Sequence, residues 1–132
     1  MNKRTAYITG ESYYSMTTKK NTKGKYASNC YEVGVKNPEI DDDNSAILEE
    51  YSKSRTDDDG NGYDYLHIKN SKFEIPMFDM NNKRMPEAVA IPNGTNITMF
   101  VQEEYNANFD TNYLVCKAIR VNEEIKEFNP FA

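Results

Sequence analysis

The hydrophobic and polar positions of this chain alternate with a period of two over much of its length. The N-terminal third contains three such segments, Arg4–Thr9, Tyr13–Thr18 and Tyr26–Lys36, separated by turn residues or by a lysine-rich loop. Because this alternation places neighbouring side chains on opposite faces of a strand, the three segments are predicted strands. In the third segment, Val33 and Val35 are expected to face the core.

One segment has helical periodicity instead. A helix is predicted over Asn44–Arg55, because its first residue is a favourable N-cap and Ile47, Leu48 and Tyr51 form one apolar stripe. The Asp, Gly and Asn residues that follow predict a polar loop over Arg55–Asp64.

Short strands resume after this loop, joined by turns rich in Gly and Asn. They are predicted at Tyr65–Lys69, Phe73–Asp79, Met85–Ile91, Ile97–Glu104 and Asn112–Val121, with turns at Asn81-Asn82 and Pro92-Asn93-Gly94. Many short strands with a single helix between them favour a small barrel. We expect one domain over residues 1–121 and a separable tail over 122–132.

The charge of the chain is unevenly distributed. The 132 residues carry a formal net charge of −5, but residues 41–64 hold nine acids and two bases, and residues 122–132 hold three acids and one base. The remainder has thirteen bases against nine acids. The net charge therefore does not exclude a polyanionic partner.

Several classes of protein are disfavoured by what the sequence contains. Residues 1–20 show no apolar core of a signal peptide, and no apolar run is long enough to span a membrane, so we expect a soluble, cytoplasmic chain. Cys30 and Cys116 have no metal-ligand spacing and are expected to be free thiols.

The sequence offers no complete metal or catalytic motif. Asp57-x-Asp59-x-Asn61-Gly62 matches the start of an EF-hand loop, but the twelfth position is Ile68 where a bidentate Glu is required. His67 is the only histidine, and there is neither a Gly-flanked Ser nor a Gly-rich phosphate loop. We expect no metal, no cofactor and no enzymatic activity.

Aromatic and basic residues interleave on the predicted strands. Tyr65, His67 and Lys69 share one strand face, and Tyr113 and Lys117 share another. Such a mixture can stack on bases and neutralise phosphates, which is how proteins bind single-stranded nucleic acid without sequence preference. The pattern is equally typical of ordinary solvated strand faces, and on the pattern alone both interpretations stay open.

The order of several segments is similar to that of a known family. Gly24–Pro38, Lys69–Phe73, Phe78–Pro86, Ile91–Ile97 and Ala118–Val121 resemble, in sequence and in spacing, the OB-fold single-stranded DNA-binding proteins of tailed phages, especially short-tailed podoviruses. The resemblance implies a mainly β fold, namely a five-stranded OB-type Greek-key barrel with one inserted α-helix. It also implies sequence-independent binding of single-stranded DNA during phage DNA replication, recombination and repair in the infected cell.

The resemblance also places the binding residues. An aromatic that stacks on bases before the last strand corresponds to Tyr105. A second aromatic is expected at the position of Ala107, and Phe109 is the candidate that replaces it. With the interleaved strand residues, the predicted nucleic-acid-binding set is Lys25, Tyr65, His67, Lys69, Lys72, Phe73, Tyr105, Phe109, Tyr113 and Lys117.

The family resemblance further implies an acidic C-terminal tail with an aromatic end that contacts a phage polymerase or helicase/primase. The residues that match this tail are Glu123, Glu124, Glu127, Phe128 and Phe131. A homodimer is a further candidate assembly, although the residues do not determine the oligomeric state. The alternative from the residues alone is an acidic OB or β-sandwich protein-interaction module, or a DNA mimic, that binds no nucleic acid.

Overall fold

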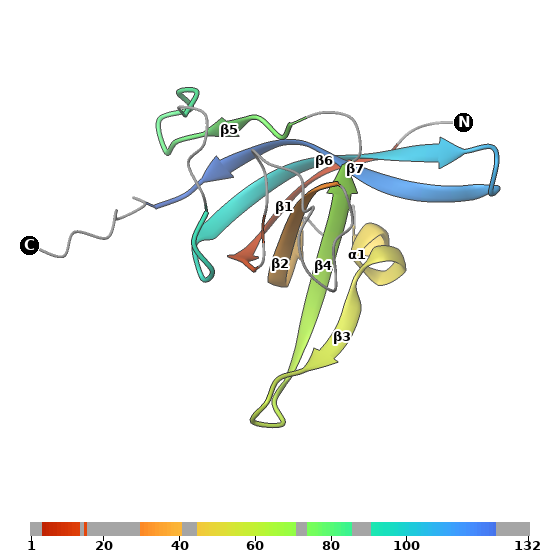
Figure 1. Ribbon diagram of the computed structural model, residues 1–132, viewed down its shortest axis with the longest axis horizontal. Coiled ribbons are helices and arrows are strands. Elements are labelled where there is room, and N and C mark those ends of the chain that lie inside the picture. The colour runs from red at the N-terminus through yellow and green to blue at the C-terminus, as the bar shows by residue number, and fades with distance from the viewer. Residues whose placement is uncertain are drawn as a thin grey trace, which may run out of the picture.

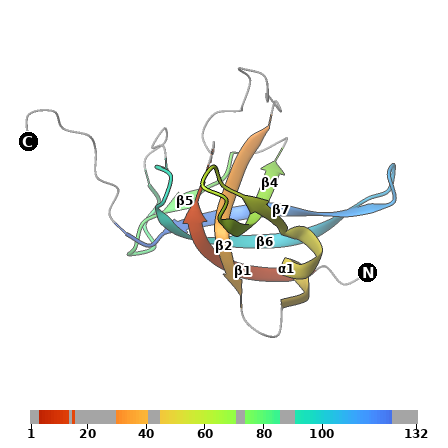
Figure 2. The same cartoon turned by 90° about the horizontal axis from the view of Figure 1, so that it is seen from below.

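The computed structural model describes residues 4–13, 15, 30–40, 45–70, 74–85 and 91–123 (Figures 1 and 2). Within these ranges the predicted mainly β class with one helix is confirmed. The elements in chain order are β1 (Thr5–Ser12), β2 (Tyr31–Ile40), α1 (Ser45–Tyr51), β3 (Lys53–Thr56), β4 (Gly62–Asn70), β5 (Met77–Phe78), β6 (Asn96–Asn106) and β7 (Thr111–Val121).

The described strands form one sheet in the order β3-β4-β2-β1-β6-β7-β5. Neighbouring strands are antiparallel except β5 and β7, which are parallel. The expectation of a five-stranded Greek-key barrel was wrong, because the described strands form an open sheet of seven. The two additional strands are the short edge strands β3 and β5, which lie on opposite sides of the molecule (Figure 1).

The core lies on one face of the curved sheet and is built from alternate strand positions. Val33 and Val35 have no exposed surface, which confirms their predicted orientation. The other fully buried strand residues include Ile8, Ile97, Met99, Val101, Ile119 and Val121. Removal of these side chains from water is the main favourable contribution to folding.

Helix α1 is shorter than predicted and covers one end of this core. Ile47 is buried, and Leu48 and Tyr51 pack against the core cluster, so the predicted apolar stripe is confirmed. The helix ends where the backbone N–H and the hydroxyl of Ser52 both donate to the Leu48 carbonyl. In the part of the chain that the structure describes, no helix is both long and apolar enough to cross a membrane.

The segment predicted as the polar loop Arg55–Asp64 is instead a β-hairpin between β3 and β4. Arg55 pairs with Tyr63, and Thr56 pairs with Gly62. The Asp57 carboxylate accepts the backbone N–H groups of Asp59 and Asn61, so the oxygen that begins the EF-hand-like motif closes the turn. Within the described ranges, no three His, Cys, Asp or Glu side chains cluster as a metal site.

Two predicted turns and one predicted strand end were tested by the structure. The turns at Asn82 and Gly94 are confirmed, and both residues have positive φ angles, 62° at Asn82 and 88° at Gly94. The predicted end of the first strand at Gly10 was wrong, because β1 continues to Ser12. An added Cβ at Gly10 would lie 2.9 Å from the Lys36 carbonyl oxygen, so the glycine allows β2 to approach there.

The remaining boundaries differ more widely. Most of the predicted strands Tyr13–Thr18 and Met85–Ile91 lies outside the described residues, and of Phe73–Asp79 only Met77–Phe78 is a strand. The last two predicted strands are present as β6 and β7, each extended by one to three residues.

A buried side-chain amide joins β4 to β7, which are not neighbours in the sheet. The Nδ2 of Asn70 donates to the Cys116 carbonyl at 2.7 Å, and the Cys116 N–H donates to the Asn70 Oδ1 at 3.2 Å. Asn70 is 7% exposed, and Cys116 is buried as well, so that burial raises the pKa of its thiol to about 12. The amide therefore substitutes for backbone pairing between two strands that are not hydrogen-bonded neighbours.

We predict that Asn70→Ala lowers the free energy of unfolding by about 2–5 kcal/mol, because two buried backbone groups of Cys116 lose their partner at about 1–3 kcal/mol each. Urea denaturation followed by circular dichroism measures the change. Asn70→Asp should also be destabilised, because it places a carboxylate oxygen against the Cys116 carbonyl. Asn108→Ala, on an exposed turn, is the matched control, and an Asn70→Ala protein as stable as this control would contradict the role of the amide.

Candidate nucleic-acid interface

A pocket of about 390 Å³ lies between the β3–β4 hairpin and the start of β7. We call it the basic pocket, because Lys53, Arg55 and Lys69 are among its lining residues and no carboxylate lines it in the described part of the chain. Leu66, Ile68 and Leu114 contribute apolar lining, and Tyr51 contributes from helix α1. Four predicted residues, Tyr65, His67, Lys69 and Tyr113, are thus brought together from two strands.

The three cations of the basic pocket are exposed and are available to a ligand. None of Lys53, Arg55 and Lys69 takes part in an ion pair with another described residue. The guanidinium of Arg55 lies 5.4 Å from the centre of the Tyr65 ring, which holds it over the pocket wall. Clustered cations without carboxylate partners produce a local positive potential that attracts anions.

Tyr65 lines the basic pocket but is only 8% exposed. Its hydroxyl donates to the Tyr13 carbonyl at 3.3 Å, and burial raises its pKa to about 12. A Cβ at Gly34 would clash with that hydroxyl, so the ring lies where only glycine leaves room. Tyr65 therefore forms part of the pocket wall and presents little ring surface for stacking.

Two more tyrosines and a lysine complete an aromatic cluster around Tyr65. Its ring lies 5.8 Å from that of Tyr13 and 6.4 Å from that of Tyr63, both nearly edge to face. The Lys36 ammonium lies 4.1 Å from the centre of the Tyr13 ring. Aromatic pairs of this geometry stabilise the outer surface of β2 and β4 beyond the area they bury.

His67 is held between two partners on the wall of the basic pocket. Its Nδ1 lies 2.9 Å from the Tyr65 hydroxyl, and its Nε2 lies 3.2 Å from Oε1 of Glu32, which is 6% exposed. Both ring nitrogens are thus engaged within the protein. The orientation of the imidazole ring is therefore fixed, and His67 forms a polar part of the pocket wall.

The aromatic residues predicted before the last strand lie on the β6–β7 hairpin, which extends beyond the rest of the sheet (Figure 1). Tyr113 is 43% exposed at the pocket, whereas Tyr105 and Phe109 lie nearer the hairpin tip and do not line it. Phe109 is 77% exposed, and the Tyr105 hydroxyl donates to Asp110. The hairpin thus presents three exposed rings.

Other predicted residues lie elsewhere. Lys117 is exposed at a bulge where β7 has one residue more than β6, and it does not line the pocket. Glu123 is exposed just after β7. The predicted residues Lys25, Lys72, Phe73, Glu124, Glu127, Phe128 and Phe131 lie outside the described residues.

Sequence reasoning missed Lys53 and Arg55, which it placed at the end of a helix and the start of a loop. The signal that identifies them is the alternation of Lys53, Ser54, Arg55 and Thr56 directly before an Asp-Gly turn, which is typical of a hairpin strand. This alternation puts Lys53 and Arg55 on one side of β3.

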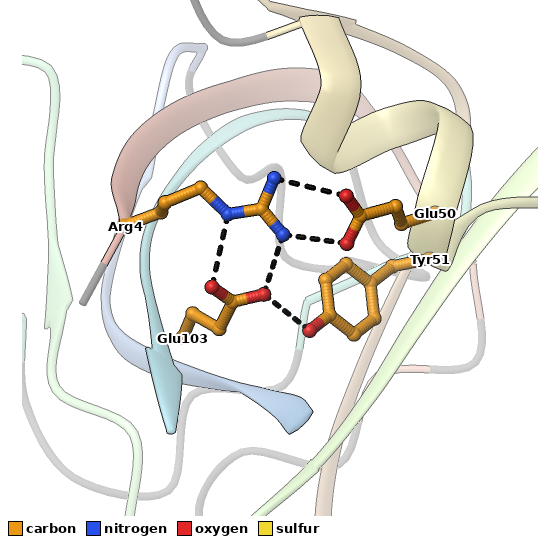
Figure 3. Close-up of polar contacts among 4 residues, drawn as sticks. All are labelled: Arg4, Glu50, Tyr51 and Glu103. Atoms are coloured by element: carbon orange, nitrogen blue, oxygen red, sulfur yellow. Dashed lines mark hydrogen bonds and ion pairs between the residues drawn. The ribbon is translucent and has the colours of Figure 1, made fainter. Parts of the chain in front are cut away.

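A polar cluster ties helix α1 to the sheet (Figure 3). The Arg4 guanidinium donates to both oxygens of Glu103, at 2.9 and 2.6 Å, and to both oxygens of Glu50, at 3.1 and 2.5 Å. Tyr51, which lines the pocket, donates its hydroxyl to Oε2 of Glu103 at 2.5 Å. We call these four residues the Arg4 cluster.

The Arg4 cluster shifts the ionisation of its members. The hydrogen bonds from Arg4 lower the pKa of Glu103, although its burial acts in the opposite direction. Burial, followed by the hydrogen bond to Glu103, raises the pKa of Tyr51 to about 12. Glu103 is therefore a carboxylate at neutral pH, and its charge is satisfied by three donors.

Comparisons with known proteins identify a similar fold. No protein-family model matches the chain, and no curated protein matches its sequence. Among solved structures, the crystal structure of gp2.5, a single-stranded DNA-binding protein encoded by bacteriophage T7, matches with a TM-score of 0.52. The match covers 100% of this chain and 97% of that chain at 11% sequence identity. At this identity, the likeness shows a shared fold.

We predict that Glu103→Gln lowers the free energy of unfolding at pH 7 by about 1–3 kcal/mol, because it removes the charge that Arg4 and Tyr51 were bonded to. Because the pKa of Glu103 is lower in the folded protein, its ionised carboxylate stabilises the fold at pH values above the ordinary carboxyl pKa of about 4.3. This stabilisation is lost as the pH falls through the lowered pKa. The stability of Glu103→Gln should therefore fall less than that of the parent between pH 6 and acid pH.

Urea titrations at a series of pH values measure both effects. Glu50→Gln is the matched control, because the Glu50 side chain is 51% exposed and a surface pair contributes only about 0–1 kcal/mol. Identical pH profiles for Glu103→Gln and the parent would show that Glu103 does not carry this dependence.

Proposed function

We propose that this chain binds single-stranded DNA without sequence preference, with the basic pocket and the β6–β7 hairpin as its contact surface. The observation that carries the proposal is a pocket with three exposed cations, an exposed tyrosine and no carboxylate among its described lining. A shared fold with a single-stranded DNA-binding protein supports it. Cations bind any phosphate and aromatic rings stack on any base, so such a surface needs no base-reading geometry.

The arrangement of β4, β2, β1, β6 and β7 supports an OB-type assignment for the central strands. These five strands are consecutive neighbours in the sheet, and the Asn70 amide brings the two outer ones together. OB folds bind oligonucleotides on a strand face flanked by loops. The basic pocket lies beside β4 and under the hairpin between β6 and β7, which corresponds to that position.

The roles of the residues follow from their surroundings. Lys53, Arg55 and Lys69 contact phosphates, and Tyr113 stacks on a base beside them. Tyr105 and Phe109 stack on further bases along the hairpin. We retain four further predicted residues as DNA contacts. Lys117 does not line the pocket, and Lys25, Lys72 and Phe73 lie outside the described ranges.

The wider role follows from this activity and from the family resemblance. A protein that coats single strands protects and organises them during phage DNA replication, recombination and repair in the cytoplasm of an infected cell. The tail over 122–132, with Phe128 and Phe131, is proposed to contact replication proteins such as a polymerase or helicase/primase. The proposed role involves no catalysis.

Salt dependence tests the phosphate contacts. Binding of fluorescent oligothymidylate should weaken as salt increases, and Arg55→Ala or Lys69→Ala should each flatten the log–log salt slope by about 0.7. Lys83→Ala is the matched control, because Lys83 is exposed after β5 and does not line the basic pocket. A chain that binds no oligonucleotide at low salt would refute the function and favour the protein-interaction alternative.

Aromatic substitutions test the stacking contacts. We predict that Tyr113→Ala and Phe109→Ala each weaken oligothymidylate binding by about 1–3 kcal/mol, because each removes one exposed ring. Tyr113→Phe should bind as the parent does, since the ring is retained. Fluorescence anisotropy at fixed salt measures the affinities, and circular dichroism verifies the fold. Unchanged affinity in both folded alanine variants would remove the stacking model.

A further inference from the structure

A second pocket of about 290 Å³ lies on another part of the sheet and shares no lining residue with the basic pocket. We call it the Tyr7 pocket. Its lining comes from β1, β6 and β7, together with Phe78 of β5 and Asn82 of the following turn. β5 is the sheet edge opposite β3 (Figure 1), so the two pockets lie toward different ends of the sheet.

Strand alternation explains why aromatic rings are exposed here. Ala6 and Ile8 of β1 face the core, so Tyr7 between them points away from it and is 65% exposed. Phe100 lies between the buried Met99 and Val101 on β6. Tyr7 and Phe100 are paired across the two strands, and their ring centroids lie 5.0 Å apart. Tyr7 is the more exposed of the two rings, and the half-buried ring of Phe100 lies beside it in the pocket lining.

A positioned cation lies beside these rings. The Nε of exposed Arg120 donates to Oδ1 of Asn122 at 3.0 Å. The amide nitrogen of Asn122 donates in turn to Asn96 at 2.7 Å and to Thr98 at 2.9 Å. These bonds hold one edge of the guanidinium and leave its two terminal nitrogens without an ion pair among the described residues. That free edge suits a phosphate.

The surrounding charges also favour an anion. No carboxylate lines the Tyr7 pocket in the described ranges, and Arg84 lies 5.9 Å from the ring centre of Phe78. The nearest turn contains Asp79, but its carboxylate accepts the backbone N–H groups of Asn81 and Lys83. The acid is thus engaged by its own turn, and Arg120 is the one charged residue among the described lining of the pocket.

We propose that the Tyr7 pocket is a second contact for single-stranded nucleic acid, which takes one nucleotide with its base against Tyr7 and Phe100 and its phosphate at Arg120. The inference rests on the proposed function for the chemistry of the ligand. A nucleotide supplies both a planar ring and an anion, which are the two features that this lining complements. The pocket volume of about 290 Å³, just below the roughly 300–1,000 Å³ typical of ligand sites, suits a single such unit.

Oligonucleotide length separates the two sites. A strand of about 6 nucleotides fills one site, whereas a strand of about 30 nucleotides can reach both, and joining two contacts on one strand raises the overall affinity. Tyr7→Ser should therefore bind the short strand as the parent does and bind the long strand roughly tenfold more weakly. Tyr7→Phe should restore the long-strand affinity, and Tyr113→Ala should weaken both strands. Lys83 lines neither pocket, so Lys83→Ala should change the affinity for neither strand beyond a small salt-dependent effect.

Ultraviolet cross-linking of a long strand that carries 5-iodouracil, with the cross-linked peptide found by mass spectrometry, gives an independent result. A cross-link on the peptide that contains Tyr7 supports the second site. The second site is wrong, while the proposed function stands, if three results occur together. The parent binds both strands, Tyr7→Ser binds each strand with the affinity of the parent, and no cross-link forms on the Tyr7 peptide. If the parent binds neither strand, the proposed function fails. A change in the sedimentation of DNA-free Tyr7→Ser would identify this surface as a protein interface and overturn the proposal.

Discussion

The buried amide of Asn70 is the contact on which the geometry of the basic pocket depends. β4 and β7 are separated in the sheet by three other strands, yet both of them line this pocket. The amide donates to and accepts from the backbone of Cys116, so both of its polar groups and both of that residue's backbone groups are satisfied away from water. A hydrogen bond in a low-dielectric interior is strong and directional, and an apolar contact would not fix the two strands in this way.

The opposite side of the pocket is fixed by charge instead. Arg4 joins Glu103 of β6 to Glu50 of helix α1, and Tyr51 belongs both to this cluster and to the pocket lining (Figure 3). The helix has only seven residues, too few to be stable by itself, so its position depends on Ile47 in the core and on these polar contacts. The exposed tyrosine and cations are thus held on a frame whose own polar groups are already paired.

The sequence predicts those parts of the fold that depend on the order of neighbouring residues along the chain. The alternation around Val33 and Val35 and the turns at Asn82 and Gly94 follow from strand periodicity and backbone conformation, and the structure confirms them. Strand β3 was missed because its four residues are all exposed and carry no apolar periodicity, so the alternation before the Asp-Gly turn is its one sequence signal. The burial of Tyr65 depends on the space left by Gly34 on another strand, and the bond between Arg4 and Glu103 joins residues 99 positions apart. Such contacts are products of the tertiary fold.

The acidic net charge and the two cation-lined pockets are compatible because no described carboxylate lines either pocket. Many of the described carboxylates bond within the protein: Glu50 and Glu103 with Arg4, Glu32 with His67, Asp57 and Asp79 with their own turns, Asp64 with Ser54, Glu104 with Gln102, and Asp110 with Tyr105. By contrast, Lys53, Arg55, Lys69, Arg84 and Arg120 pair with no carboxylate in the described ranges. Since exposed charges are screened beyond about 8 Å at physiological salt, a phosphate at either pocket responds to the cations beside it more than to the total of −5. The distribution of the charges, and not their sum, decides which partners this chain attracts.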